Sequence, residues 1–112
     1  MLPKANRLKK KKDFDRVFKE GRGVKSGSLF FKYAPSALAC TRFGFAVGQK
    51  VSKKAAVRNK IKRRLREIAK KKLPEIKAAI DGVVVAQKGT ENLDFKSLNK
   101  LMEEIFKKAK LI

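Results

Sequence analysis

The side chains with the clearest chemical capacity in this 112-residue sequence are the cations between Lys50 and Lys72. This segment, KVSKKAAVRNKIKRRLREIAKKK, holds twelve lysines and arginines against one acid, Glu67. Ammonium and guanidinium groups bind phosphate, and Asn59 adds a donor and an acceptor that suit a sugar hydroxyl or a base edge. A merely solvated surface is the alternative, but such surfaces intersperse both signs of charge. The segment therefore predicts contact with a nucleic acid.

Side chains suited to protein-based catalysis are scarce in this chain. It contains no histidine and one cysteine, Cys40, so a zinc-type site lacks ligands and an internal disulfide is excluded. Its ten acids are dispersed, and the pair Asp13 and Asp15 has a spacing that turns the two to different faces of a helix. We predict no catalytic residue and no metal site in the protein. The solitary cysteine is typical of a reducing cytosol, which predicts a cytoplasmic location.

The composition predicts one folded and strongly cationic domain. A net charge of +21 favours a polyanionic partner, and 43% hydrophobic residues suffice for a core. No apolar stretch approaches membrane-spanning length, so we predict no membrane partner. Residues 1–12 hold six cations and no acid. They are predicted to form a flexible basic arm, which either orders on phosphate or only aids solubility.

The cations of residues 50–72 require a helix to align them. Four apolar side chains recur there at helical spacing: Val57, Ile61, Leu65 and Ile68. At about 100° per residue they fall within a sector of about 80°, which is predicted to pack on the domain. The opposite half carries a row of polar side chains, spaced about 5–6 Å from turn to turn. These are Arg58, Asn59, Lys62, Arg63, Arg66 and Lys70.

The remaining elements are predicted from periodicity and from turn-forming residues. Residues 21–28 are rich in glycine and serine and indicate a loop, Asp81-Gly82 indicates a turn, and 75–80 indicate one more helical turn. With a third strand before the basic helix, the order is α-β-β-β-α-β-α, an α+β single-domain two-layer sandwich with helices mainly on one side of a sheet. The predicted elements are helices at 13–20 and 94–109 and strands at 29–33, 41–47 and 83–86, the last buried on both faces.

Two of these strands create a sheet face with few large side chains. Alternation places Phe30 and Lys32 on one face, and Arg42, Gly44 and Ala46 on the corresponding face of the next strand. One interpretation is a groove for single-stranded nucleic acid, because a base stacked on an aromatic side chain contributes about 1–3 kcal/mol. The other is a close-packing surface covered by a helix. The phenylalanines of the first helix present the same choice between core and exposed platform.

The segment Arg58–Glu67, RNKIKRRLRE, follows Lys53-Lys54 and precedes a valine-rich strand. This arrangement resembles the signature of the protein subunit of bacterial ribonuclease P. The resemblance covers nearly the whole chain in the family's order and ends in an amphipathic helix. Its other motifs are Asn6-Arg7-Leu8, Asp13-Phe14 with Val17-Phe18 and Gly21, Gly44-Phe45-Ala46-Val47, and Val83-Val84-Val85-Ala86-Gln87-Lys88.

The resemblance implies a fold and a function. The basic helix would connect two parallel strands in a left-handed crossover, against the usual right-handed preference. The protein would be the accessory subunit of a ribonucleoprotein endoribonuclease that removes the 5′ leader of precursor tRNA, with residues 13–112 as one RNA-binding α+β domain. Its partners would be the catalytic RNA and precursor tRNA, and not DNA. The RNA would perform catalysis and hold most of the Mg²⁺, and the protein alone would bind none.

The resemblance also implies two sets of site residues. The surface for the catalytic RNA comprises Lys53, Lys54, Arg58, Asn59, Lys60, Lys62, Arg63 and Arg66. The cleft for the single-stranded leader comprises Phe14, Phe18, Phe30, Lys32 and Ala46, which favours the groove over the packing surface. The sequence departs from the family pattern at Val51-Ser52-Lys53-Lys54, where a turn glycine is usual, and near Ile112, where no aromatic residue stands.

Two other classes of function share part of this pattern. A structural RNA-binding protein of the ribosome would have the same charge and fold class but would not need a leader groove. A duplex-DNA-binding protein could use residues 53–67 as a recognition helix, although no partner helix precedes them. Protection of a precursor leader, and preference for structured RNA over duplex DNA, would separate these classes from the first.

Overall fold

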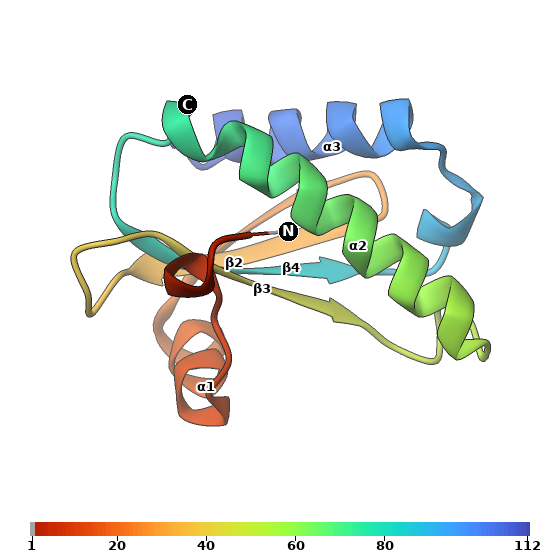
Figure 1. Cartoon of the computed structure of the whole chain (residues 1–112), viewed down its shortest axis with the longest axis horizontal. Coiled ribbons are helices and arrows are strands. Elements are labelled where there is room, and N and C mark those ends of the chain that lie inside the picture. Colours follow the sequence, from red (N-terminus) through yellow and green to blue (C-terminus); the bar gives the residue numbers. More distant parts are fainter. Residues whose placement is uncertain (1) are drawn as a thin grey trace.

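The structure is a computed structural model that describes residues 2–112. Its helices are α1 (Lys11–Glu20), α2 (Ala55–Lys72) and α3 (Phe95–Lys108), and its strands are β1 (Arg22–Ser26), β2 (Leu29–Pro35), β3 (Arg42–Val47) and β4 (Ile80–Ala86). The strands form one sheet in the order β1-β2-β4-β3, with α2 and α3 on one face and α1 on the other (Figure 1). This arrangement confirms the predicted α+β two-layer sandwich and its order of elements.

The connection between β3 and β4 is the least common feature of the topology. These two strands are parallel neighbours, and α2 joins them. In Figure 1 the chain runs from left to right along β3 and returns from right to left along α2, above the sheet. It then runs from left to right again along β4, which lies behind β3. This path is a left-handed crossover, as the family resemblance implied and against the general right-handed preference.

Strand β1 corrects the prediction of a loop over residues 21–28. Its residues pair with β2, for example Val24 with Phe31, and the chain reverses at Gly27, whose φ is +55°. A positive φ favours glycine, so this residue permits a tight hairpin. The strand lacks a hydrophobic alternation because it lies at the sheet edge, where exposed Arg22 and Lys25 discourage pairing with another chain.

The predicted turn at Asp81-Gly82 is wrong, because both residues lie inside β4. Gly82 packs against the ring of Phe31, and a Cβ at this position would lie 2.6 Å from two ring carbons. The glycine therefore makes room for an aromatic ring within the sheet rather than forming a turn.

Helix α2 buries the predicted face. Ile61, Leu65 and Ile68 are buried, and Val57 is half-buried. After α2 the chain forms a single 3-10 turn at Leu73–Glu75. The helical turn predicted for 75–80 is therefore wrong, because the chain must already be extended where β4 begins.

Aromatic rings fill the core between the sheet and the helices α2 and α3. Phe43 stacks on Phe106 with ring centroids 5.5 Å apart, and Phe31 meets Phe106 edge-on at 5.6 Å. The start of α3 is capped by Asp94, which accepts a hydrogen bond of 2.8 Å from the backbone N–H of Ser97. This hydrogen bond lowers the pKa of Asp94.

The N-terminal segment runs beside β3 and fills part of the core. Leu2 and Leu8 are buried, and the backbone N–H of Leu8 donates to the carbonyl of Phe43 at 2.9 Å. The Nε of Arg7 donates to the carbonyl of Leu2 at 2.8 Å. The basic arm predicted for residues 1–12 thus packs on the domain from position 2 onward, while its mobility in solution stays a prediction.

Replacing Leu2 with alanine tests this packing. We expect Leu2→Ala to lower the free energy of unfolding by about 2–5 kcal/mol, because it removes a large buried side chain. Urea denaturation measures the change. Lys4→Ala, an exposed neighbour, is the control and should stay within about 0.5 kcal/mol of the parent. An unaltered stability of Leu2→Ala would mean that the segment is detached in solution.

Candidate nucleic-acid interface

The outer face of the sheet, opposite α2 and α3, carries a partly open row of side chains. The sheet register aligns Phe30 of β2, Val85 of β4 and Ala46 of β3 side by side. Each of the three is half-buried. This row (Phe30, Val85 and Ala46), called the open row below, offers apolar surface to solvent across three strands.

Helix α1 covers the neighbouring part of the same face. Phe14 lies over Gly44, where a Cβ would lie 2.5 Å from two ring carbons, and Val17 is fully buried in a cluster with Val83. Phe18, one turn after Phe14, keeps 42% of its surface exposed. The face is therefore divided between a closely packed part under α1 and the open row beside it, and binding of a nucleic acid there stays a prediction.

The predicted cleft residues lie in the open row or next to it. Phe14 and Ala46 pack against the cluster under α1, and the ring of Phe30 lies over Gly23, where a Cβ would be 2.8 Å away. The Nζ of Lys32 donates to the carbonyl of Gly21 at 3.3 Å, which ties its ammonium group to the end of α1. The structure thus places all five predicted residues on α1 or on one sheet face, and leader binding by them stays a prediction.

A hollow at the end of the open row contains residues that the sequence analysis did not assign. It has a volume of about 950 Å³ and lies where β3 and β4 end. Parallel neighbouring strands have their carboxyl ends at the same end of the sheet. This rule could have predicted that Lys50 and Lys88, which follow β3 and β4, lie near each other. Val85 belongs to both the open row and the hollow. The hollow is lined by Gly48, Gln49, Lys50, Val51, Lys53, Val85, Ala86, Gln87 and Lys88, without an acid.

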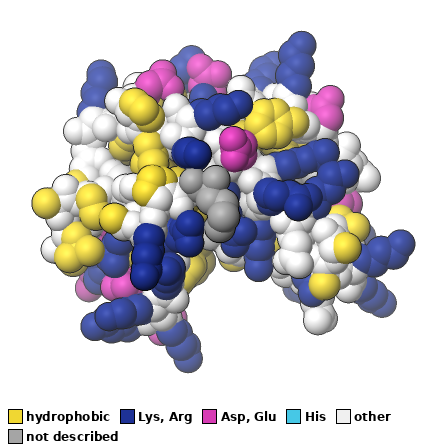
Figure 2. Space-filling view, viewed as in Figure 1, with side chains coloured by type: hydrophobic (Ala, Val, Ile, Leu, Met, Phe, Trp, Pro, Cys, Tyr) yellow, Lys and Arg dark blue, Asp and Glu magenta, His cyan; other side chains and the backbone are white. Residues whose placement is uncertain are grey.

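The predicted RNA-contacting residues of α2 differ in exposure. Those on the solvent-facing side of α2 and just before its start are exposed: Lys53, Lys54, Asn59, Lys60 and Arg63. Those on the flank of the helix are half-buried: Arg58, Lys62 and Arg66. Figure 2 shows lysine and arginine side chains spread over α2 and over α1, with few acidic side chains among them. The exposed set is therefore the part of α2 best placed for a polyanion.

Arg58 has a partner within the protein. Its Nη1 donates to the carbonyl of Ser52 at 2.9 Å and to that of Lys53 at 3.0 Å. The backbone N–H of Lys54 donates to the Oγ of Ser52 at 3.2 Å. These hydrogen bonds hold the loop before α2, Val51-Ser52-Lys53-Lys54. Arg58 therefore supports the loop in addition to any contact with a ligand.

A second hollow, of about 300 Å³, joins α2 to the N-terminal segment and α1 along the edge of β3. Arg66 of α2, Lys9 and Phe14 all line it. Helices α2 and α1 lie on opposite faces of the sheet, and both line this hollow at the edge of β3, together with Lys9. A ligand that contacts both helices has a cationic path around this edge.

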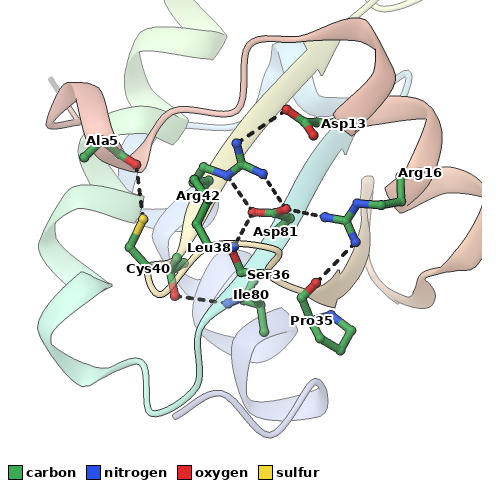
Figure 3. Close-up of polar contacts among 11 residues, drawn as sticks. Ala5, Asp13, Arg16, Pro35, Ser36, Leu38, Cys40, Arg42, Ile80 and Asp81 are labelled. Carbon is green, nitrogen blue, oxygen red and sulfur yellow. Dashed lines mark hydrogen bonds and ion pairs between the residues drawn. The ribbon is translucent and has the colours of Figure 1, made fainter.

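One cation that the sequence placed beside the groove lies on the predicted face but is paired within the protein. Arg42 donates to the buried carboxylate of Asp81, through Nε at 2.8 Å and Nη2 at 2.7 Å (Figure 3). Its side chain is 13% exposed, and the hydrogen bond to Asp81 raises the pKa of Arg42. Arg42 is therefore engaged inside the protein. No local pattern indicates this pair, because its members are 39 residues apart.

The structure also bears on metals and membranes. Among residues 2–112, no group of three or more histidine, cysteine, aspartate or glutamate side chains is placed to hold a metal ion. Within the same part of the chain, no helix combines the length and the apolar character that crossing a membrane requires.

Comparison with known proteins gives consistent matches over the full domain. Residues 2–110 match the family model described as Ribonuclease P. The ribonuclease P protein component of Dictyoglomus turgidum is 37% identical over 113 residues, covering 99% of this chain and 94% of that protein. The solved RNase P protein of Staphylococcus aureus is 31% identical with a TM-score of 0.89, covering 96% of this chain and 98% of that one. That of Thermotoga maritima is 28% identical with a TM-score of 0.82, covering 91% and 96%.

Two arginines of α2, Arg58 and Arg63, should differ in their effect on folding. We expect Arg58→Ala to lower the free energy of unfolding by about 1 kcal/mol, because two backbone carbonyls lose their donor. The matched variant Arg63→Ala, at an exposed position of the same helix, should change it by less than about 0.5 kcal/mol. Urea denaturation compares the two. Equal stabilities would contradict the role of Arg58 in the loop.

Proposed function

The chain belongs to the ribonuclease P protein family, and from that premise we propose that it binds the family's catalytic RNA together with the 5′ leader of precursor tRNA. In this proposal the exposed cations of α2 bind the catalytic RNA, and the open row with Phe14, Phe18 and Lys32 binds the leader. The protein thereby assists the endonucleolytic step that produces the mature 5′ end of tRNA, in the cytoplasm.

The observation that carries the leader proposal is the open row beside Phe18. Its three half-buried side chains and the exposed phenylalanine present apolar surface, and the lysine-lined hollow lies at its end. Bases of a single strand are free to stack on such a surface, whereas paired bases are not. Lysines beside it can follow the phosphates. A single-stranded segment of RNA therefore fits this strip better than a duplex.

The proposed contact with the catalytic RNA uses phosphate recognition. Lys53, Lys54, Lys60 and Arg63 are exposed on one side of the molecule, and neutralising RNA phosphates with such groups releases counterions. A duplex-DNA binder would use α2 as a recognition helix, but the element before α2 is the strand β3 rather than a partner helix. A structural RNA-binding protein would have no use for the open row. These observations favour the ribonuclease P role.

We propose that chemistry belongs to the RNA. Mg²⁺ would activate the attacking water and stabilise the leaving oxygen, held mainly by RNA ligands. The described carboxylates are poor candidates for holding it, since Asp81 is paired with arginines and no acidic cluster occurs among residues 2–112. The protein would contribute binding energy away from the reacting bond, through the leader. Its cations would lower the repulsion between substrate and catalytic RNA.

The leader proposal is tested by substitution of Phe18. We expect Phe18→Ala, in the complex with catalytic RNA, to weaken binding of precursor tRNA by about 1–3 kcal/mol through loss of base stacking. Binding of mature tRNA should not change. Phe95, which is 37% exposed on α3, provides the matched control, and Phe95→Ala should affect neither substrate. Equal losses for precursor and mature tRNA would refute leader binding at Phe18.

The contact between α2 and the catalytic RNA is tested by its salt dependence. We expect Arg63→Ala to reduce the slope of log K against log salt by about one, because one phosphate loses its partner. Lys100→Ala, an exposed cation on α3, removes the same charge away from the proposed surface and should leave the slope nearly unchanged. Filter binding to the catalytic RNA over a salt series gives both slopes. Indistinguishable slopes for the two variants would exclude this face of α2.

A further inference from the structure

We propose that Arg16, held by the buried carboxylate of Asp81, is a positioning residue that sets where α1 stands beside the open row. This inference rests on the proposed function, because it concerns how the protein discriminates leader-bearing RNA. It assigns to two charged residues outside the predicted surfaces the task of placing Phe14 and Phe18.

The centre of the arrangement is a fully buried carboxylate shared by two guanidinium groups. The side chain of Asp81 is 0% exposed, and it accepts two hydrogen bonds from Arg42 of β3. The Nη2 of Arg16, from α1, donates to the same carboxylate (Figure 3). The Oγ of Ser36 donates to it at 3.3 Å. One carboxylate in β4 therefore connects the helix α1 to two strands.

Helix α1 makes further polar contacts in the same place. The Nη1 of Arg16 donates to the carbonyl of Pro35 at 3.2 Å, and the Oδ2 of Asp13 pairs with Nη1 of Arg42 at 3.4 Å. Asp13 and Arg16 are three residues apart, so they share a face of the helix. Phe14 and Phe18, four residues apart, share another. Val17 lies between these two faces and contacts the sheet.

The apolar contact alone determines the position of α1 poorly. Val17 is the buried residue of this ten-residue helix, and hydrophobic burial has no preferred direction. A guanidinium–carboxylate pair has a defined geometry, since its donors lie in one plane at fixed angles. Arg16 therefore restricts both rotation and tilt of α1 on the sheet. Those two motions determine the distance between Phe18 and the open row.

The cluster is separate from the proposed surface for catalytic RNA. Helix α2 lies on the other face of the sheet, and the described partners of Asp81 and Arg16 all lie on α1, β3, β4 and residues 35–36. Loss of Arg16 should therefore alter the cleft wall and leave the α2 surface intact. A residue needed only for overall stability would affect both surfaces together.

The test substitutes Arg16 with leucine, which keeps much of the side chain's apolar stem and leaves the Asp81–Arg42 pair in place. In the complex with catalytic RNA, we expect Arg16→Leu to weaken the binding of precursor tRNA about tenfold, because even a small displacement of a binding group lowers affinity. Affinities for mature tRNA and for the catalytic RNA should stay within about twofold. Glu104→Leu is the matched control: it removes the acceptor of the 2.6 Å hydrogen bond from Ser26, another link between a helix and the sheet, and should change none of the three.

A double-variant comparison separates positioning from direct contact. If Arg16 acts through α1, the loss in Arg16→Leu with Phe18→Ala should be clearly smaller than the product of the two single losses. Independent, multiplying losses would overturn the proposal. Arg16→Lys keeps the charge but not the planar fork, so it should also lose affinity for precursor. Retained affinity in Arg16→Lys would indicate a direct contact with phosphate and would likewise overturn it.

The outcomes distinguish this inference from the function on which it rests. If the parent protein does not favour precursor over mature tRNA, the leader proposal itself fails. If the parent does favour precursor and Arg16→Leu does so equally, only the positioning role is refuted. Asp81→Asn provides a second test, because it weakens the acceptor for both arginines. It should reproduce the precursor-specific loss in protein whose circular dichroism spectrum is unchanged, and a folded Asp81→Asn with full precursor affinity would contradict the proposal.

Discussion

The hydrogen bonds of β4 to both of its neighbours determine how the rest of the molecule is arranged. β4 pairs with β2 antiparallel and with β3 parallel. These two ladders bring Phe30, Val85 and Ala46 into one row and bring the ends of β3 and β4 to one sheet edge. A slip of one residue would exchange the inner and outer side chains of a strand. Because most of β4 is buried, that exchange is costly, and the register of the open row is well determined.

The excess of positive charge is handled in two different ways. On α2 the cations lie outside an apolar stripe that holds the helix to the core, so their mutual repulsion persists until a polyanion binds. Beneath α1, two arginines are partly withdrawn from solvent and share the carboxylate of Asp81. The first group is available for RNA, whereas the second maintains the geometry of the surface that RNA meets. The same residue type thus serves binding in one place and architecture in the other.

The sequence predicted the elements whose signal is local. The helical period of Ile61, Leu65 and Ile68 predicted the buried face of α2, and the alternation around Phe45 predicted β3. Strand β1 was missed because an edge strand of mixed polarity carries no such period. The turn predicted at Asp81 was wrong because this aspartate is buried in a strand. Its burial is compensated by Arg16, a partner 65 residues away that no local pattern indicates.

The candidate site was likewise predictable only in part. Family resemblance supplied the two residue sets, but not the exposure that separates Arg63 from Arg58, nor the contribution of Val85, Lys50 and Lys88. These depend on which strands become neighbours, a property that no single segment encodes. The most direct measurement of the central claim is cleavage of precursor tRNA at low Mg²⁺ by the catalytic RNA alone, by the protein alone and by both together. We predict that only the pair cleaves, at the mature 5′ end. Equal cleavage by the RNA with and without bound protein would contradict the account.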